Sequence, residues 1–211
     1  TEIKLASFRD KKVINSINYF EMLEELSCSN FIFAGPGSPS YASKIWSDSK
    51  IPEIFKTHIN KGGSAIFSSA AASTLGNKTL PVYEIYKVGL DPYWEKGLNV
   101  LEIFNLNCTI IPHFNNKEGG THDTSYSYVG KRRMNTLLEK EFTNIIGIDE
   151  HTALILNGED NSFEVEGIGN VTVINHKEEE KFAKDKAYNL DELKTLLPLS
   201  KDNVYKSKKN K

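Results

Sequence analysis

The chain has few cysteines and no long apolar run. Cys28 and Cys108, its two cysteines, lie far apart, which excludes the usual zinc-binding spacings and gives no disulfide framework. No apolar stretch approaches the roughly 20 residues that span a bilayer, and the first residues lack the pattern of a signal peptide. The sequence therefore predicts a protein of a reducing compartment, with the cytoplasm as its expected location.

The chain also lacks an excess of charge of either sign, because 26 basic and 28 acidic residues give a net charge of -2. Neither nucleic acid nor an anionic membrane is therefore an expected partner. A length of 211 residues suits a single domain over 1–211. The basic segment at the C-terminus is the local exception, and we expect 200–211 to be a disordered tail.

Short apolar runs rich in β-branched and aromatic residues alternate with segments of helical length. The runs are 31–34, 65–67, 108–111 and 145–148, and the helical segments are 13–26, 41–46, 51–60 and 126–142. This alternation predicts an α/β fold with a mostly parallel sheet between helices, a three-layer sandwich.

The pattern changes after Glu150. Three apolar runs separated by turn sequences, 153–156, 163–165 and 171–174, predict an antiparallel β-meander at the edge of the sheet. The charged run 177–186 is expected to be a solvated loop or a short surface helix. A final helix is predicted over 189–196, with Asn189 as its N-cap.

The first segment that could contribute to a binding or catalytic site is the loop Gly35-Pro36-Gly37, which directly follows an apolar run. At the carboxyl edge of a parallel sheet, its glycines would let backbone N–H groups approach a ligand. A tight strand-to-helix turn explains the same residues equally well. The missing Gly-Lys-Ser/Thr ending excludes a phosphate-binding P-loop.

A second strand runs into two serines, Ser68 and Ser69, which small residues follow at once. A nucleophile elbow needs such a turn with little side-chain bulk, so that a serine Oγ stands clear. A serine that caps a helix, with ordinary backbone angles, explains the same residues, and this segment taken alone favours that interpretation.

Two further strand ends carry a histidine and acids. His113 follows 108–111, and Asp149, Glu150 and His151 follow 145–148. Because parallel strands end at one sheet edge, His113 could act as a general base that a carboxylate orients. A metal site that includes His122 and Asp123 is the alternative, although no two histidines have helical spacing and no cysteine joins them.

Taken together, several segments resemble the cyanophycinase-like and peptidase E-like serine hydrolases of the class I glutamine amidotransferase-like superfamily, whose fold is flavodoxin-like. The likeness covers roughly 30–173, and the matching segments are 35–42, 68–72, 83–89, 112–116, 118–124, 130–133 and 147–153. The resemblance implies a serine-type peptidase or amidase that cleaves an amide or peptide bond without a cofactor or a metal.

Carried over residue by residue, the resemblance assigns the nucleophile to Ser69, the general acid and base to His113 and the acid to Glu150. Backbone N–H groups of the oxyanion hole fall on Gly35, Gly37 and Ala70. The candidates for substrate binding are Arg132, Arg133, His122 and Asp123. A small peptide or amide with an acidic residue is the implied substrate, and the two arginines could equally be solvated charges.

The sequence departs from the family at two points. Phe67 and Ala71 replace the glycines of the elbow, and no βαβ unit precedes the first residues. We therefore expect the family's first βαβ portion to be missing, an apolar sheet face or edge to be uncovered, and the chain to form homodimers or to be poorly soluble. The alternative function is a non-catalytic binding or sensory protein with the same fold. A glutamine amidotransferase is less compatible, since its nucleophile is a cysteine and Cys108 lies inside a strand.

Overall fold

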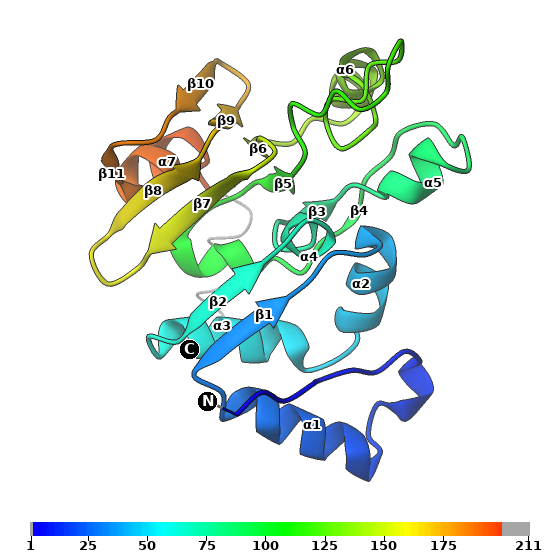
Figure 1. Cartoon of the computed structure of the whole chain (residues 1–211), viewed down its shortest axis with the longest axis vertical. Coiled ribbons are helices and arrows are strands. Elements are labelled where there is room, and N and C mark those ends of the chain that lie inside the picture. The colour runs from blue at the N-terminus through cyan, green and yellow to red at the C-terminus, as the bar shows by residue number, and fades with distance from the viewer. Residues whose placement is uncertain (1, 200–211) are drawn as a thin grey trace.

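The computed structural model describes residues 2–199, which form a mixed α/β structure (Figure 1). The α-helices are α1 (Ile17–Ser27), α2 (Pro39–Trp46), α3 (Ile51–Asn60), α4 (Ala70–Ser73), α5 (Val82–Tyr86), α6 (Lys131–Lys140) and α7 (Leu190–Leu196), and the short 3-10 helices are η1 (Lys11–Val13) and η2 (Val100–Phe104). The strands are β1 (Phe31–Ala34), β2 (Ser64–Phe67), β3 (Lys78–Thr79), β4 (Glu95–Lys96), β5 (Thr109–Ile111), β6 (Ile145–Ile148), β7 (Thr152–Asn157), β8 (Ser162–Gly167), β9 (Val171–Ile174), β10 (Glu179–Phe182) and β11 (Ala187–Asn189). The predicted tail 200–211 lies outside the described residues. No helix within 2–199 is long and apolar enough to cross a membrane.

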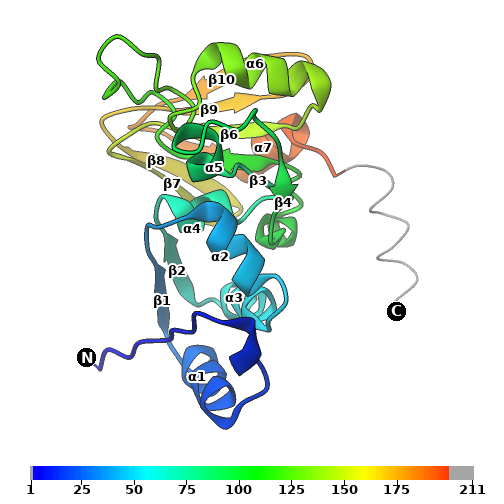
Figure 2. The same cartoon turned by 90° about the vertical axis from the view of Figure 1, so that its right-hand side faces the viewer.

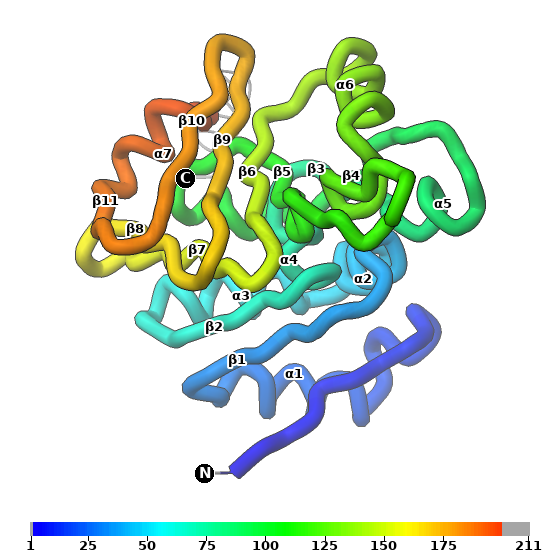
Figure 3. The backbone as a smooth tube through the Cα atoms, turned by 45° about the horizontal axis from the view of Figure 1, so that its top comes forward, coloured from blue at the N-terminus to red at the C-terminus, as the bar shows by residue number. Residues whose placement is uncertain are grey.

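The strands form four small sheets. β1 pairs in parallel with β2, and β5 pairs in parallel with β6. β9 and then β10 continue the β5–β6 sheet in antiparallel fashion (Figure 3), while β7, β8 and β11 form a separate antiparallel sheet and β3 pairs with β4. The expectation of one mostly parallel sheet is therefore not confirmed within 2–199, because the strands after β6 return as antiparallel neighbours. The three-layer arrangement stays a prediction.

The β-meander that was predicted after Glu150 is correct only for its first hairpin. β7 pairs with β8 along six residue pairs, from Thr152 with Gly167 to Asn157 with Ser162. β9 instead inserts between β6 and β10. Its residues Val171 and Val173 are buried in the core cluster that also contains Phe163, and this burial accounts for the different partner.

The charged run 177–186, which was predicted to be a loop or a surface helix, contains strand β10 instead. Phe182 ends this strand with 1% of its surface exposed. Its ring makes edge-to-face contacts with Phe163 and Tyr188, each at a centroid distance of 5.0 Å. One buried aromatic side chain thus anchors an otherwise charged segment to the core.

We expect Phe182→Ala to lower the free energy of unfolding by about 3–5 kcal/mol, because it empties a closed part of the core. Phe33→Ala is the matched control: Phe33 is 62% exposed, so its truncation should change stability by less than about 0.5 kcal/mol. Chemical denaturation of both variants measures the difference. Equal losses would contradict the assigned positions of the two rings.

The β1–β2 pair has one covered face and one open face. Helices α1 and α3 pack on the covered face, where Ile32 lies in a cluster with Leu23 and Phe55 (Figure 2). On the opposite face Phe31, Phe33 and Ile66 are each more than half exposed. An apolar sheet face is therefore uncovered by the described residues, as expected, and self-association stays a prediction.

Capping side chains mark the starts of α2 and α7. The side chain of Asn189 and the side chain of Glu192 form a capping box at α7, which confirms the predicted final helix. Ser38 caps α2, where Pro39 occupies the first turn. The helix predicted over 126–142 is shorter than expected, because α6 begins only at Lys131 and the preceding residues 126–128 have positive φ angles.

The candidate catalytic and oxyanion-hole residues follow the ends of four strands. β1 leads into the Gly35–Gly37 loop, β2 into Ser69, β5 into His113 and β6 into Glu150. Although β1–β2 and β5–β6 belong to separate sheets, both pairs are parallel. Their carboxyl ends meet, and a site of open α/β folds is expected at such an edge.

Candidate active site

Ser69 occupies the turn between β2 and α4 in an unusual backbone conformation. Its φ of 52° and ψ of -109° lie outside the regions that non-glycine residues commonly adopt, and its side chain makes no capping hydrogen bond. A helix-capping serine would have a β-region backbone and would accept a bond from a following N–H. The geometry is therefore that expected of an elbow. The buried Ala70, Ala71 and Ala72 leave room for it.

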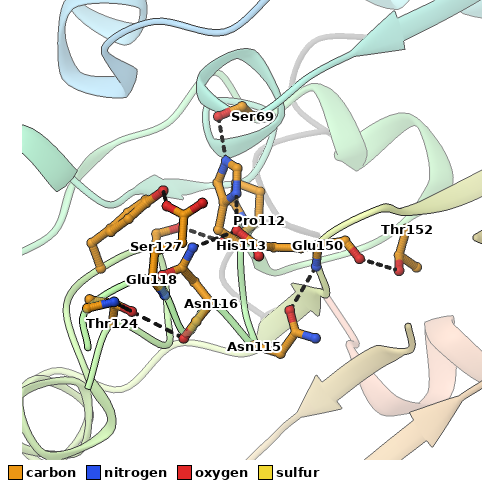
Figure 4. Close-up of polar contacts among 12 residues, drawn as sticks. Ser69, Pro112, His113, Asn115, Asn116, Glu118, Thr124, Ser127, Glu150 and Thr152 are labelled. Atoms are coloured by element: carbon orange, nitrogen blue, oxygen red, sulfur yellow. Dashed lines mark hydrogen bonds and ion pairs between the residues drawn. The ribbon is translucent and has the colours of Figure 1, made fainter. Parts of the chain in front are cut away.

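The Ser69 hydroxyl lies against the imidazole of His113 (Figure 4). Oγ is 2.9 Å from Nε2, and on the other side of the ring Nδ1 is 3.2 Å from Oε1 of Glu150. His113 itself has a positive φ of 50°. The structure thus brings together the three residues that the resemblance assigned to catalysis, in the order serine, histidine and carboxylate.

Two asparagines that lie two and three residues after His113 hold Glu150 in place (Figure 4). The side-chain amide of Asn116 donates a 2.6 Å hydrogen bond to Oε1 of Glu150, and Oδ1 of Asn115 accepts a 2.8 Å bond from the Glu150 backbone N–H. The bond from Asn116, followed by the contact with His113, lowers the pKa of Glu150 below its ordinary value. Glu150 is therefore ionised at neutral pH, so Nδ1 of His113 donates to it and Nε2 is free to accept the Ser69 proton.

We expect Asn116→Ala to raise the pKa of Glu150 toward its ordinary value, because the variant removes the largest contribution to the lowered pKa. A carboxyl ¹³C NMR titration measures this shift. Asn115→Ala is the control, since Asn115 contacts only the backbone of Glu150. An unchanged titration midpoint in Asn116→Ala, or an equal shift in both variants, would contradict this cause.

The lowered pKa also has a consequence for stability. Because the folded-state pKa of Glu150 lies below its unfolded value, the ionised carboxylate favours the folded state. This contribution is fully present above the unfolded pKa and is lost as the pH falls through the folded pKa. Asn116→Ala, which raises the folded-state pKa of Glu150 toward the unfolded value, should therefore reduce the contribution of the Glu150 carboxylate to the free energy of unfolding.

Ser69 and His113 open onto a cavity of about 320 Å³. Its further lining includes Tyr83, Tyr86 and Lys87 from α5 and its C-terminal end, together with Tyr128. The amine of Lys87 lies 4.4 Å from the centre of the Tyr83 ring. The cavity wall thus contains three tyrosines and one lysine, which suits a small organic substrate with an anionic group.

The predicted oxyanion-hole residues are placed differently from one another. Gly37 and Ala70 line the cavity beside Ser69, whereas Gly35 is not part of its lining. Ala70 follows Ser69 directly, so its N–H lies at the start of α4. Of the three candidates, Gly37 and Ala70 are therefore the two that a bound substrate would meet.

The four predicted substrate-binding residues do not line the cavity. Arg133 donates to the backbone carbonyls of Ile85 and Leu90, at 3.5 Å and 2.5 Å, and so links α6 to the segment around α5. Asp123 accepts a bond from the Ser125 hydroxyl and another, at 2.7 Å, from the backbone N–H of Lys131 at the start of α6, and these bonds, the first above all, lower its pKa. His122 and Arg132 are exposed. Substrate binding by these residues stays a prediction.

Sequence reasoning missed the aromatic wall and the role of Asn116 at Glu150. Tyr83, Tyr86 and Lys87 lie in a segment that matched the family, and their spacing on one helical turn was the available signal. Their separation in the sequence, more than twenty residues from His113 and more than forty from Tyr128, hid the shared cavity.

Cys108 is unsuited to replace Ser69 as a nucleophile. Its side chain is fully buried, and burial raises the pKa of its thiol to about 12. Within residues 2–199, no three histidine, cysteine or acidic side chains are grouped so that they could hold a metal ion.

The fold of the chain is similar to that of solved structures. No protein-family model matches the sequence, and no curated protein matches it significantly. Among solved structures, a peptidase from an acI-B1 actinobacterium aligns with a TM-score of 0.64 and 20% identity, over 87% of this chain and 67% of the other. A protein described as a putative peptidase E from Listeria monocytogenes EGD-e aligns with a TM-score of 0.50 and 15% identity, over 71% of this chain and 65% of the other.

The chain thus spans about two thirds of the length of each of these solved structures. Both are named as peptidases, and at such low identity the likeness concerns the fold. The chain therefore has a peptidase E-like fold, in agreement with the resemblance of its sequence motifs.

Proposed function

We propose that this chain is a serine-type peptidase or amidase that uses Ser69, His113 and Glu150. The observation that carries the proposal is the 2.9 Å contact between Ser69 Oγ and His113 Nε2, on a turn with a positive φ that faces a cavity. A nucleophile, a base within hydrogen-bonding reach and a third group that orients the base are the recurring parts of such enzymes.

In the first half of the proposed reaction, Ser69 Oγ attacks the carbonyl carbon of the scissile amide while its proton passes to Nε2 of His113. Glu150 stabilises the resulting imidazolium through Nδ1. The oxygen of the tetrahedral intermediate takes up negative charge, which the backbone N–H groups of Ala70 and Gly37 would stabilise. The imidazolium then gives its proton to the leaving amine as the carbon–nitrogen bond breaks, and an acyl-serine remains.

In the second half, water attacks the acyl-serine and gives its proton to Nε2 of His113. Collapse of the second tetrahedral intermediate returns this proton to Ser69 Oγ and releases a carboxylic acid. The histidine thus acts alternately as base and acid. Its orientation by Glu150 and Asn116 persists through both steps.

The proposed substrate is a small peptide or amide with an acidic residue. Lys87 supports this choice, because it lines the cavity and its ammonium group can pair with a carboxylate. Arg132 and Arg133, which the resemblance suggested, lie outside the cavity lining. The cavity volume of about 320 Å³ favours a compact substrate over a long polymer segment.

Hydrolysis of paired dipeptides tests the proposal. The two members of a pair share the second residue and differ only in the first, which is aspartate in one and the nearly isosteric asparagine in the other. We expect release of free amino acids from the aspartyl member, slower release from the asparaginyl member, and loss of both after treatment with a fluorophosphonate. Lys87→Met, which retains much of the side chain without its charge, should reduce the difference within each pair. No hydrolysis of any peptide or amide would contradict the enzyme and favour a non-catalytic binding protein.

A further inference from the structure

Three consecutive residues next to the site have a left-handed backbone. Tyr126, Ser127 and Tyr128 have φ angles of 55°, 54° and 69°, and none of them is glycine. L-residues normally visit this region singly, because the side chain approaches the backbone too closely. Residues 126–128 are hereafter called the left-handed turn. Their conformation is maintained only because the surrounding structure enforces it.

Hydrogen bonds from the left-handed turn hold the segment that carries His113. Ser127 Oγ donates to the carbonyl of Pro112, and the Ser127 N–H donates to the carbonyl of His113 at 3.3 Å. The Tyr126 N–H donates to the carbonyl of Phe114 at 3.0 Å. One turn thus binds three successive carbonyls, those of Pro112, His113 and Phe114.

The opposite side of the same segment is attached to β6. The Phe114 N–H donates to the carbonyl of Ile148 at 3.0 Å, two residues before Glu150. His113, whose φ is also positive, is consequently held between β6 and the left-handed turn. Ser127 is 98% buried, so water competes little for these bonds.

We propose, on the basis of the proposed function, that the left-handed turn positions His113 for Ser69 and that Ser127 is its principal positioning residue. Ordinary right-handed angles would turn the Tyr126 and Ser127 N–H groups away from the carbonyls of Phe114 and His113. The turn also places the Tyr128 ring in the cavity wall, 6.0 Å from the His113 ring between centroids. The same strained element therefore sets the base and shapes one side of the cavity.

Ser127 also lines the cavity, so direct contact with a substrate is the competing role. The two roles differ in what they affect. A positioning residue changes the reactivity of Ser69 toward any electrophile, including a small fluorophosphonate that occupies little of the cavity. A substrate-binding residue changes KM and leaves the labelling rate as it was.

The test measures the rate at which a fluorophosphonate labels Ser69 in Ser127→Ala and Ser127→Gly. We expect both variants to label roughly 10-fold to 100-fold more slowly, because a displacement of His113 by less than about 1 Å suffices for such a loss. Glycine adopts positive φ freely, so Ser127→Gly should melt at a higher temperature than Ser127→Ala while remaining equally slow. Thr195→Ala, which removes a 2.8 Å bond from a hydroxyl to the Asp191 carbonyl on α7, is the control and should label at the wild-type rate.

A ¹⁵N NMR spectrum of the His113 imidazole separates this inference from the proposed function. If the wild-type protein is not labelled at all, the proposed function fails, whereas the imidazole signals still report the position of His113. We expect these signals to shift in Ser127→Ala and to stay unchanged in Thr195→Ala. Unchanged imidazole signals in Ser127→Ala, wild-type labelling in that variant, or a rise in KM alone would overturn the positioning role.

Discussion

Ser69→Ala is expected to lower the rate of amide hydrolysis about a million-fold, the loss typical of a triad nucleophile. The fold should stay intact, because alanine carries the same Cβ as serine and the φ of 52° is no more strained with it. Steady-state hydrolysis of the preferred dipeptide, together with the thermal unfolding of the variant, measures both quantities.

Ser68→Ala is the matched control for this prediction. Ser68 is the adjacent serine, and its backbone N–H bonds to the carbonyl of Ala34 at 2.9 Å, a contact that alanine keeps. We expect its activity to stay within a few-fold of the wild type. Full activity in Ser69→Ala, or a comparable loss in Ser68→Ala, would remove Ser69 from the mechanism.

The second large effect is expected for Glu150→Gln, which should lower kcat by about ten-thousand-fold, as for the neutralised acid of a related triad. The glutamine amide is nearly isosteric with the carboxylate, but it can present a donor to Nδ1 of His113 and so favour the wrong tautomer. It also fails to stabilise the imidazolium. The pH dependence of kcat and its absolute value measure the loss.

Asp149→Asn controls for the loss of a negative charge near the site. The Asp149 carboxylate accepts a 2.9 Å bond from the Asn170 N–H, which an asparagine oxygen can also accept. Among the described residues, the acidic side chain that is hydrogen-bonded to His113 is that of Glu150. We expect nearly unchanged kcat in this variant. A similar loss in both variants would mean that general electrostatics, and not the contact of Glu150 with His113, accounts for the effect.

Much of the fold near the site could be predicted from local patterns. The runs 31–34 and 145–148 and the helix 51–60 match their elements residue by residue, because each is an apolar segment between clear turn residues. The parallel arrangement of β1 with β2 and of β5 with β6 then places residues after these strands near a common edge. The proximity of Ser69, His113 and Glu150 follows from this topology and from the family motifs.

The remaining features depend on long-range contacts that no local pattern contains. The burial of Phe182 against Phe163 and Tyr188 turns a charged run into strand β10. The left-handed turn 126–128 interrupts a helical pattern because three carbonyls around His113 compete for its donors. The cavity lining was missed for the same reason, since it joins α5 to a turn more than forty residues away.

The most direct test of the proposed enzyme is the site of covalent modification by a fluorophosphonate. The folded protein would be treated with the probe, digested and mapped by mass spectrometry, with heat-denatured protein and Ser69→Ala treated in parallel. The proposed function predicts one adduct, on Ser69, that is missing from both parallel samples. No adduct on the folded protein, or an adduct on Ser68 or another serine, would contradict it.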